Sequence, residues 1–462
     1  MENYDVIVIG GGPGGYVAAI RCAQLGKKVA LVEKEHLGGV CLNWGCIPTK
    51  ALLKSAEMLH HIKHAQDFGI NIAEYKIDIK QMVARSRRVS SQLAAGIKGL
   101  LKKNKVTVFE GTAQIAKNKI IEVKNSKEQF SIKASNIIIA TGARPKILPG
   151  FEPDGKQIWT SREAMIPESL PKSIIIVGSG AIGIEFASFY NALGVDVTIL
   201  EAQDRILPVE DAEISALAQK IFIQQGIKIF TNVKLLDHKI SQNQISVNIQ
   251  FEEKKHLHTA DKLLMAVGIS GNIANIGLEN TKIKVANSHI VTDEFMQTDE
   301  VGIYAIGDVA GSPWLAHKAS HEGIIVANMI AGLKPHLINK NNIPGCTYSY
   351  PQIASVGLTE SAAKAVGYQV RVGKFPYQAN GKALALGELN GLIKTIFDAK
   401  TGELLGAHMI GAEVTELIQG YVIAKNLEAT ELDLINTIFP HPTLSEMMHE
   451  SVLQAYGKAI HI

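Results

Sequence analysis

The sequence predicts an α/β fold with two Rossmann-like dinucleotide-binding domains and a C-terminal α+β domain. Three observations lead to this prediction: a glycine fingerprint occurs twice, each copy follows an apolar strand, and the strand pattern changes after about residue 340. Crossover patterns of strand and helix predict parallel sheets, whereas consecutive short strands predict an antiparallel one. With 462 residues, the chain is long enough for about three domains.

The composition is that of a globular protein, with 46% hydrophobic and 20% charged residues. The 47 basic and 44 acidic residues give a net charge of +3, so we expect no nucleic-acid partner. The basic run Arg85, Arg87 and Arg88 is interpreted as a solvated helix face. No apolar run reaches the ~18 residues of a membrane helix. The opening segment has no signal-peptide pattern, so we expect a cytoplasmic chain with reduced cysteines.

The first fingerprint follows the predicted strand Tyr4–Ile9. It carries Gly10, Gly12 and Gly15, opens a helix, and precedes a strand that ends at Glu33, 33 − 10 = 23 residues after the first glycine. The first glycine permits a tight turn, the second lets the backbone approach a pyrophosphate, and the third lets helix and strand pack closely. The pyrophosphate lies at the helix N-terminus, and the acid accepts hydrogen bonds from ribose hydroxyls.

The second fingerprint repeats this pattern with Gly178, Gly180 and Gly183. Its acid is Glu201, again 201 − 178 = 23 residues after the first glycine. A carboxylate at this place repels a 2′-phosphate, so Glu201 favours NAD over NADP. Two adenine dinucleotides on one chain predict FAD and NAD, because a flavin takes up a hydride and releases electrons singly or in pairs.

The order of the strands predicts the domain boundaries. An FAD-binding domain spans 1–143 and resumes over 270–340, where a strand ends in Gly307-Asp308. An NAD-binding domain occupies 144–269 between these parts. Residues 341–462 read as an antiparallel α+β domain that is free to form a subunit interface.

The most informative segment contains Cys41 and Cys46. Their C-x4-C spacing fits neither common zinc pattern, and no further Cys or His cluster accompanies it, so we expect no metal. Pro48 suits the first turn of a helix, which places Cys46 at a helix N-terminus where the dipole stabilises a thiolate. A disulfide here closes a very small ring and is reducible without unfolding. Two reduced core cysteines are the alternative.

Lys50 lies one helical turn after Cys46. If Lys50 is buried it needs a carboxylate partner, and Glu185 at the start of the second fingerprint helix is the candidate. The alternative is an ordinary exposed lysine.

Near the C-terminus, prolines on both sides hold the backbone of His441 extended and stiff. Glu446 is placed to accept a hydrogen bond from the imidazole Nδ1, which fixes the tautomer and stabilises imidazolium. A structural alternative is equally good on local sequence, because Thr443-x-x-Glu446 is a capping box.

The two fingerprints, the segment CLNWGCIPTK and the segment HPTLSE together resemble the pyridine nucleotide-disulphide oxidoreductases, from residue 4 to about 457. Within that family they are similar to members that oxidise dihydrolipoyl groups in 2-oxo acid dehydrogenase complexes. The resemblance implies a homodimer and a lipoyl-domain partner. It also implies a redox-active disulfide in which Cys41 attacks the lipoyl group and Cys46 lies beside the flavin. His441 is then the general base, held by Glu446 and acting in the other subunit's site.

The same resemblance assigns cofactor contacts. The implied FAD contacts, besides the first three glycines, are Glu33, Lys50, Ala113, Asp308 and Ala316. The implied NAD contacts, besides the second three, are Glu201, Val233 and Gly268, and Glu185 is expected to face the flavin. Departures from the family pattern are Ser270 where arginine is common, Phe439 where many relatives have histidine, and Trp44 at a variable position. A redox-silent flavoprotein scaffold, a different NAD(P)H-dependent disulfide reductase and a non-disulfide NADH oxidase are the alternatives.

Overall fold

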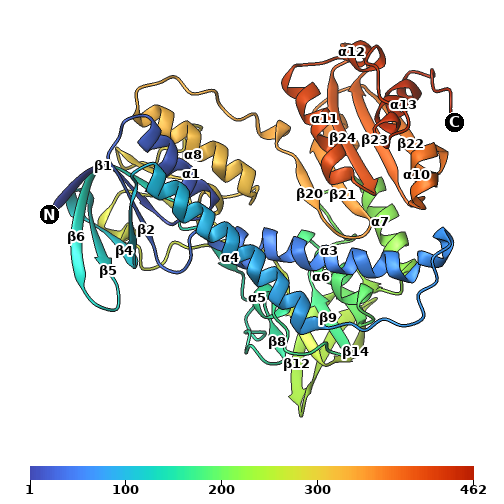
Figure 1. The fold of residues 1–462 in the computed structure, drawn as a ribbon, viewed down its shortest axis with the longest axis horizontal. Helices are drawn as coiled ribbons and strands as arrows, with labels where there is room; N and C mark the ends of the chain where they lie inside the picture. Colours follow the sequence, from blue (N-terminus) through green and yellow to red (C-terminus); the bar gives the residue numbers. More distant parts are fainter. The chain divides into compact units, whose positions relative to one another are not determined.

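Three separate stretches of sequence build the first unit of the structure, namely 1–52, 79–146 and 268–338. The second unit comprises 53–78, 147–267 and 339–462. The structure is a computed structural model that describes residues 1–462 (Figure 1).

The first unit is organised around a seven-stranded sheet. Its order is β3-β2-β1-β6-β5-β4, and β19 also pairs with β6. The strands are β1 (Glu2–Ile9), β2 (Val29–Glu33), β3 (Thr107–Glu110), β4 (Thr112–Ala116), β5 (Ile120–Lys124), β6 (Gln129–Ile139) and β19 (Ile303–Ala305). Strand β1 runs parallel to β2 and β6, whereas β4, β5 and β6 form an antiparallel extension. Parallel pairing of Ile303 with Ile137 returns the chain to this sheet from far along the sequence.

Helices cover one face of this sheet. The helices that begin in this unit are α1 (Pro13–Gln24), α2 (Gly39–Trp44), α3 (Cys46–Lys63), α4 (Ile79–Lys103) and α8 (Ala316–Ile330). Its short elements are β7 (Ala143–Pro145), β16 (Ile269–Gly271), β17 (Val285–Ala286), β18 (His289–Ile290) and the 3-10 helices η2 (Lys117–Lys119), η3 (Leu278–Asn280) and η4 (Gly307–Ala310). Helices α1 and α8 lie side by side (Figure 1). A Cβ on Gly323 of α8 would lie 2.7 Å from the carbonyl oxygen of Gly14, so this close crossing requires glycine.

Alternation along β1 separates two cores. Val6 and Val8 pack in one cluster with α1 and α8, whereas Ile7 and Ile9 pack in another with the antiparallel strands β4 and β5. A strand that is buried on both faces needs apolar residues at every position. This explains the unbroken apolar run Val6–Ile9 in the buried half of β1.

A second parallel sheet, in the order β11-β10-β9-β15-β8, begins the second unit. Its strands are β8 (Ile158–Trp159), β9 (Ser173–Val177), β10 (Asp196–Leu200), β11 (Lys228–Phe230) and β15 (Lys262–Met265), with helices α5 (Ser161–Met165), α6 (Ala181–Ala192) and α7 (Ala212–Gln224) and the 3-10 helix η1 (Ala65–Phe68). An antiparallel sheet of β12 (Lys234–Ser241), β13 (Gln244–Phe251) and β14 (Lys254–Ala260) accompanies it. Ile245, Val247 and Ile249 of β13 share a core with Ile175 and Val177 of β9.

The C-terminal part forms the antiparallel sheet β20-β21-β24-β23-β22. Its strands are β20 (Gly345–Thr347), β21 (Gln352–Gly357), β22 (Val370–Pro376), β23 (Leu392–Asp398) and β24 (Leu404–Gly411). Its helices are α9 (Glu360–Ala365), α10 (Gly381–Leu386), α11 (Val414–Asn426), α12 (Glu431–Ile435) and α13 (Glu446–Ala455), besides the 3-10 helices η5 (Lys340–Asn342) and η6 (Tyr377–Ala379). Tyr421 of α11 and Met447 of α13 pack in one core with Phe375 and Met409 of the sheet. The predicted fold class, two parallel sheets and an antiparallel α+β region, is confirmed.

Candidate active site

The first fingerprint forms a loop in which side chains have no room. Gly10 has φ +104°, and a Cβ there would lie 2.2 Å from the carbonyl oxygen of Ala140. A Cβ on Gly15 would lie 1.9 Å from the carbonyl oxygen of Gly10. Helix α1 starts with Gly12 as its N-cap, without a side-chain cap, so its first amides have no partner within the helix. The loop is therefore a cradle that fits a dinucleotide pyrophosphate.

The acid of this copy is oriented by the loop itself. Glu33 Oε2 accepts a hydrogen bond from the Gly11 amide at 2.6 Å, and Oε1 accepts one from the Glu35 amide at 2.8 Å. The carboxylate is thus fixed at the end of β2, next to the fingerprint, with lone pairs left for ribose hydroxyls.

The second fingerprint has the same geometry. Gly178 has φ +97°, and a Cβ on Gly183 would lie 2.0 Å from the carbonyl oxygen of Gly178. Gly180 is the N-cap of α6, and a Cβ at Gly180 would meet nothing within 4 Å, so the loop is open where a pyrophosphate would approach. Glu201 is only 7% exposed.

Glu201 is held by three donors. Its Oε2 accepts from the Ser179 amide at 2.8 Å and from Ser179 Oγ at 2.6 Å, and its Oε1 accepts from the Gln203 amide at 2.8 Å. Buried Val233 donates its amide to the Glu201 carbonyl oxygen, and Gly268, with φ +100°, follows β15. Gly178 thus follows β9 directly, and Glu201 follows β10 directly, at the C-terminal ends of neighbouring parallel strands.

The remaining predicted FAD contacts lie on other elements of the first unit. Ala113 is buried in β4, Asp308 is in η4, and Ala316 is the first residue of α8. Burial raises the pKa of Asp308; the cation of Lys318 opposes this shift and the carboxylate of Glu322 adds to it.

A buried ion pair on α8 secures the loop that carries Asp308. Lys318 and Glu322, 6% and 8% exposed at their side chains, pair at 2.8 Å. Glu322 Oε2 accepts from the Gly307 amide at 2.7 Å, and Lys318 donates to the Gly311 carbonyl oxygen at 3.1 Å. The pair thus fixes both ends of the Asp308 loop, a role that sequence reasoning missed.

The two predicted redox cysteines lie together as thiols. Cys41 is in α2 and Cys46 begins α3, with Gly45 between the two helices. Their side chains share a hydrogen bond, and this bond and burial raise the pKa of the Cys41 thiol. The carboxylate of Asp308 raises it further, whereas the cation of Lys50 lowers it. Cys41, Cys46, Lys50 and Asp308 are thus within electrostatic reach of one another.

Two arginines of α4 hold the segments that carry these cysteines. Arg87 Nη1 donates to the carbonyl oxygen of Asn43 at 2.6 Å, and its guanidinium lies 4.8 Å from the ring centre of Trp44. Arg85 Nη1 donates to the carbonyl oxygen of Ala51 at 3.0 Å. Arg85 and Arg88 are exposed as expected, but the interpretation of the whole run as solvated is wrong for Arg87, which is half-buried.

In the second unit, Glu446 makes both of the contacts that the sequence left as alternatives. Its Oε1 lies 2.8 Å from His441 Nδ1, and its Oε2 accepts from the Thr443 amide at 2.8 Å. Burial opposes ionisation of Glu446, but the hydrogen bonds from Thr443 and His441 outweigh it, so the pKa of Glu446 lies below its ordinary value. The imidazole is held by an ionised carboxylate while its Nε2 edge remains exposed.

Glu185 is buried on α6, and its Oε1 accepts a hydrogen bond from the Tyr348 amide at 2.9 Å. Its pairing with Lys50, which is half-buried in the first unit, stays a prediction.

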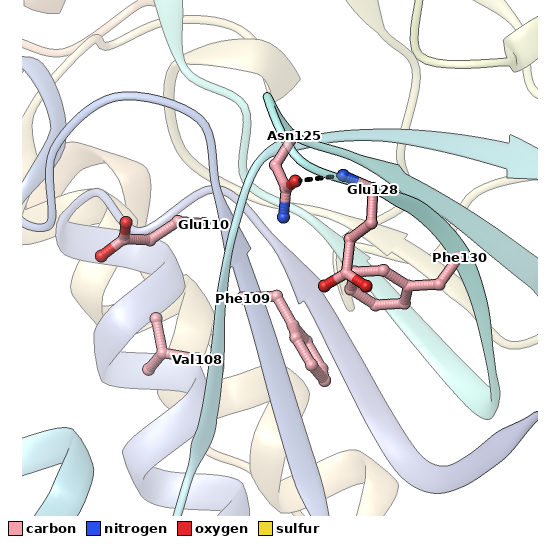
Figure 2. Close-up of a pocket in the computed structure, with 6 residues that line it drawn as sticks. All are labelled: Val108, Phe109, Glu110, Asn125, Glu128 and Phe130. Atoms are coloured by element: carbon pink, nitrogen blue, oxygen red, sulfur yellow. Dashed lines mark hydrogen bonds between the residues drawn. The ribbon is translucent and has the colours of Figure 1, made fainter.

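Figure 2 shows a separate open pocket between β3 and the hairpin of β5 and β6. The rings of Phe109 and Phe130 lie 5.2 Å apart in it, and Asn125 accepts a hydrogen bond from the Glu128 amide at 2.9 Å. Its remaining residues are Val108 and Glu110. Glu110 pairs in register with Glu33, so the pocket borders the edge of the first fingerprint and contains no predicted catalytic residue.

No group of three or more His, Cys, Asp or Glu side chains is arranged to hold a metal ion. None of the helices combines the length and the hydropathy required to cross a bilayer.

Two dinucleotide cradles and a cysteine pair beside one of them define a dinucleotide-dependent redox protein of the disulfide-exchanging class. Family comparison agrees: residues 4–323 match pyridine nucleotide-disulphide oxidoreductase, and residues 343–452 match its dimerisation domain. The chain belongs to the pyridine nucleotide-disulphide oxidoreductase family. The dimerisation domain supports a homodimer.

Curated relatives match along the whole chain. Dihydrolipoyl dehydrogenase of Rhizobium etli is 55% identical, covering 99% of this chain and 99% of the relative. Dihydrolipoyl dehydrogenase of Zymomonas mobilis is 52% identical, covering 100% and 99%. Among solved structures, LpdA from Mycobacterium tuberculosis has a TM-score of 0.91 at 27% identity, covering 98% of this chain and 99% of the other. The disulfide reductase RclA from Escherichia coli reaches 0.86 at 28% identity, covering 97% and 99%.

Proposed function

We propose that this chain is an FAD-dependent dihydrolipoyl dehydrogenase. It oxidises protein-bound dihydrolipoyl groups through a Cys41–Cys46 disulfide and passes the electrons through FAD to NAD⁺. The observation that carries this proposal is the cysteine pair at the start of α3, within electrostatic reach of Asp308 on the flavin-binding loop. Full-length relatives named dihydrolipoyl dehydrogenase support the choice of substrate.

The cofactor sites are assigned residue by residue. FAD is held by Gly10, Gly12, Gly15, Glu33, Lys50, Ala113, Asp308 and Ala316, with Glu185 facing the flavin, and NAD by Gly178, Gly180, Gly183, Glu201, Val233 and Gly268. When bound, the flavin takes up the electron pair of the reduced cysteines and delivers it as hydride to NAD⁺. The protein's contribution is to cradle both pyrophosphates, to orient both riboses with an acid, and to keep the sulfurs beside the flavin.

The thiol chemistry follows from the two residue groups. His441 takes the proton of one dihydrolipoyl thiol, and the resulting thiolate attacks Cys41 Sγ, so that the disulfide breaks and Cys46 leaves as a thiolate. Cys46 is the better leaving group because it lies at a helix N-terminus. The second lipoyl thiol then displaces Cys41 and closes the lipoyl disulfide. Dihydrolipoyl loses two electrons and two protons: the cysteine pair gains the two electrons, His441 takes one proton, and Cys41 takes the other and leaves as a thiol.

Glu446 is a positioning residue in this scheme. Its bond to His441 Nδ1 leaves Nε2 as the proton acceptor and stabilises the imidazolium that forms. The imidazole acts in the site of the other subunit of a homodimer, so each site is completed by a second copy of the chain. The partner that delivers the substrate is a lipoyl domain of a 2-oxo acid dehydrogenase acyltransferase or a related lipoyl protein.

The proposed domains are an FAD-binding domain of 1–143 and 270–340, an NAD-binding domain of 144–269 and an interface domain of 341–462. We place the chain in the cytoplasm, where reducing conditions keep the cysteines outside the site, such as Cys22 and Cys346, as thiols.

The test compares Cys41→Ser with Cys346→Ser in the purified protein. We expect Cys41→Ser to abolish NAD⁺-dependent oxidation of dihydrolipoamide while NADH still reduces the bound flavin, and Cys346→Ser to retain both reactions. Lipoamide turnover that survives in Cys41→Ser would reject the role of the cysteine pair. A yellow wild-type protein that fails to oxidise dihydrolipoamide would favour a redox-silent scaffold.

A further inference from the structure

Arg87 of α4 is a half-buried cation that contacts the segment between Cys41 and Cys46 and has no acidic partner. Its Nη1 is bound to the Asn43 carbonyl oxygen at 2.6 Å, whereas its Nε and Nη2 are buried without a hydrogen-bond partner. Burial lowers the pKa of Arg87, and no neighbouring carboxylate opposes this shift. Burying a charge without a counter-charge is unfavourable, so the position of Arg87 needs a reason.

The two fully buried lysines of this protein are neutralised. Lys318 pairs with Glu322 at 2.8 Å, and Lys394, 2% exposed at its side chain, lies within 3.2 Å of carboxylates of Asp211, Glu213 and Glu360. Arg87 differs because its guanidinium contacts a carbonyl oxygen and an aromatic ring instead. Both of these groups belong to the four residues that separate Cys41 from Cys46.

The intercysteine segment, residues 42–45, is anchored near its beginning by the side chain of Asn43. Asn43 Nδ2 donates to the carbonyl oxygens of Leu37 at 3.0 Å and Gly39 at 2.9 Å, which fixes the beginning of α2. At the other end, α2 stops at Trp44 and the backbone turns at Gly45, with φ −151° and ψ −115°. There the Gly45 carbonyl oxygen accepts from the Thr49 amide at 3.1 Å and from Thr49 Oγ1 at 2.7 Å, and Arg87 holds the two residues before it.

We propose that Arg87 is a positioning residue that holds the intercysteine segment in the conformation needed for Cys41 and Cys46 to close their disulfide. The inference rests on the proposed redox role of the pair. The stack on Trp44 and the bond to Asn43 order the segment while the cysteines are thiols. In the oxidised state the disulfide itself closes the ring and supplies that order. Loss of these two Arg87 contacts, which together we call the clamp, therefore gives the intercysteine segment more freedom mainly in the dithiol state and disfavours disulfide formation.

This difference between the two redox states predicts the direction in which loss of Arg87 shifts the disulfide equilibrium. Freeing about one residue of backbone in the dithiol state alone lowers the equilibrium constant for disulfide formation by roughly tenfold. A purely electrostatic role predicts the opposite sign, because removal of a nearby positive charge destabilises the thiolate form and favours the disulfide.

The experiment measures that equilibrium in the flavin-loaded protein. Wild type, Arg87→Met, Arg87→Lys and Trp44→Leu are equilibrated in mixtures of reduced and oxidised dithiothreitol, and the thiols are trapped by alkylation and counted by mass spectrometry. In this exchange the two cysteine thiols lose two electrons and two protons to the disulfide of oxidised dithiothreitol. Arg88→Met is the matched control, because Arg88 is the exposed neighbour on the same helix.

We expect Arg87→Met to lower the equilibrium constant roughly tenfold, with Arg87→Lys and Trp44→Leu shifting it in the same direction and Arg88→Met leaving it unchanged. A constant that rises, stays the same, or is restored fully by lysine would overturn the inference. If Arg87→Met does not retain flavin absorbance, the equilibrium constant of Trp44→Leu alone tests the inference. A wild-type protein that forms no Cys41–Cys46 disulfide would overturn the proposed function together with this inference, whereas a normal wild type with unaffected variants would overturn only the clamp.

Discussion

Replacing Glu201 with glutamine tests the origin of the preference for NAD over NADP. The carboxylate is 7% exposed and is held at both oxygens, so it cannot move away from a 2′-phosphate placed beside it. In Glu201→Gln the amide oxygen keeps the bonds to the buried Ser179, and the exposed Gln203 amide finds water instead. The variant therefore removes a charge at little cost in stability.

The size of the effect follows from Coulomb's law. Two unit charges about 4 Å apart interact by roughly 4 kcal/mol at an effective dielectric constant of about 20, the value suited to a site near the surface. This energy is an upper bound on the repulsion that Glu201→Gln removes, and it corresponds to a rise of roughly a thousandfold in kcat/KM for NADP⁺. The neutral side chain also accepts a weaker hydrogen bond from the ribose, so kcat/KM for NAD⁺ falls by roughly tenfold. We expect the NADP⁺ to NAD⁺ ratio to rise by about 10² to 10³.

The assay is steady-state oxidation of dihydrolipoamide with each cofactor, supported by binding measurements in the absence of turnover. Asp196→Asn is the matched control, because Asp196 lies at the other end of β10 with its side chain 52% exposed. The control should leave the cofactor ratio unchanged. A ratio in Glu201→Gln within threefold of wild type would refute the electrostatic reasoning.

His441→Gln should lower kcat for dihydrolipoamide by about 10² to 10⁴, the usual yield of a general base, and near-normal turnover would remove it from the mechanism. Glu446→Ala should reduce kcat in the same assay. In wild type, protonation of Glu446 as the pH falls through its lowered pKa should reduce kcat, so a wild-type pH profile with no acidic limb would argue against the dyad of His441 and Glu446. Lys394→Met leaves Asp211, 2% exposed, without its cation and should cost about 3–5 kcal/mol in denaturant unfolding; an unchanged unfolding midpoint would contradict this. Gly183→Ala should abolish NAD⁺ binding while flavin is retained, because the new methyl would lie 2.0 Å from a carbonyl oxygen, and normal affinity would disprove the fit.

The parts of the fold that sequence predicted well are those specified by local chemistry. The first and third glycines of each fingerprint have positive φ or lie too close to backbone for a side chain, so few other residues fit there. The antiparallel sheet β12-β13-β14 was not anticipated, although Ile245, Val247 and Ile249 alternate with polar residues as a half-buried strand does. This alternation of apolar and polar residues is visible in the sequence and is enough to predict the strand.

The site was harder to predict where one residue has two partners or where burial depends on distant segments. On local sequence, the bond from Glu446 to His441 and the capping-box bond to Thr443 are alternatives. A carboxylate has two oxygens, however, and in the structure each oxygen makes one of the two contacts. The prediction that Arg87 is exposed to solvent is wrong because it rests on the charge of the side chain alone. Its burial arises only when α4 packs against α2, a contact between residues 44 positions apart.

The two fingerprints also differ in a way that identical spacing conceals. In the first, a Cβ on Gly11 would lie 3.0 Å from the Leu37 side chain, so no side chain assists Glu33, which is half-buried. In the second, the equivalent Ser179 adds its hydroxyl to the bonds on a nearly buried Glu201. In the proposed reaction FAD stays bound, but NAD⁺ must bind anew in every turnover. A site that is refilled each cycle gains most from an acid already fixed in its binding geometry, because less order has to be created on binding.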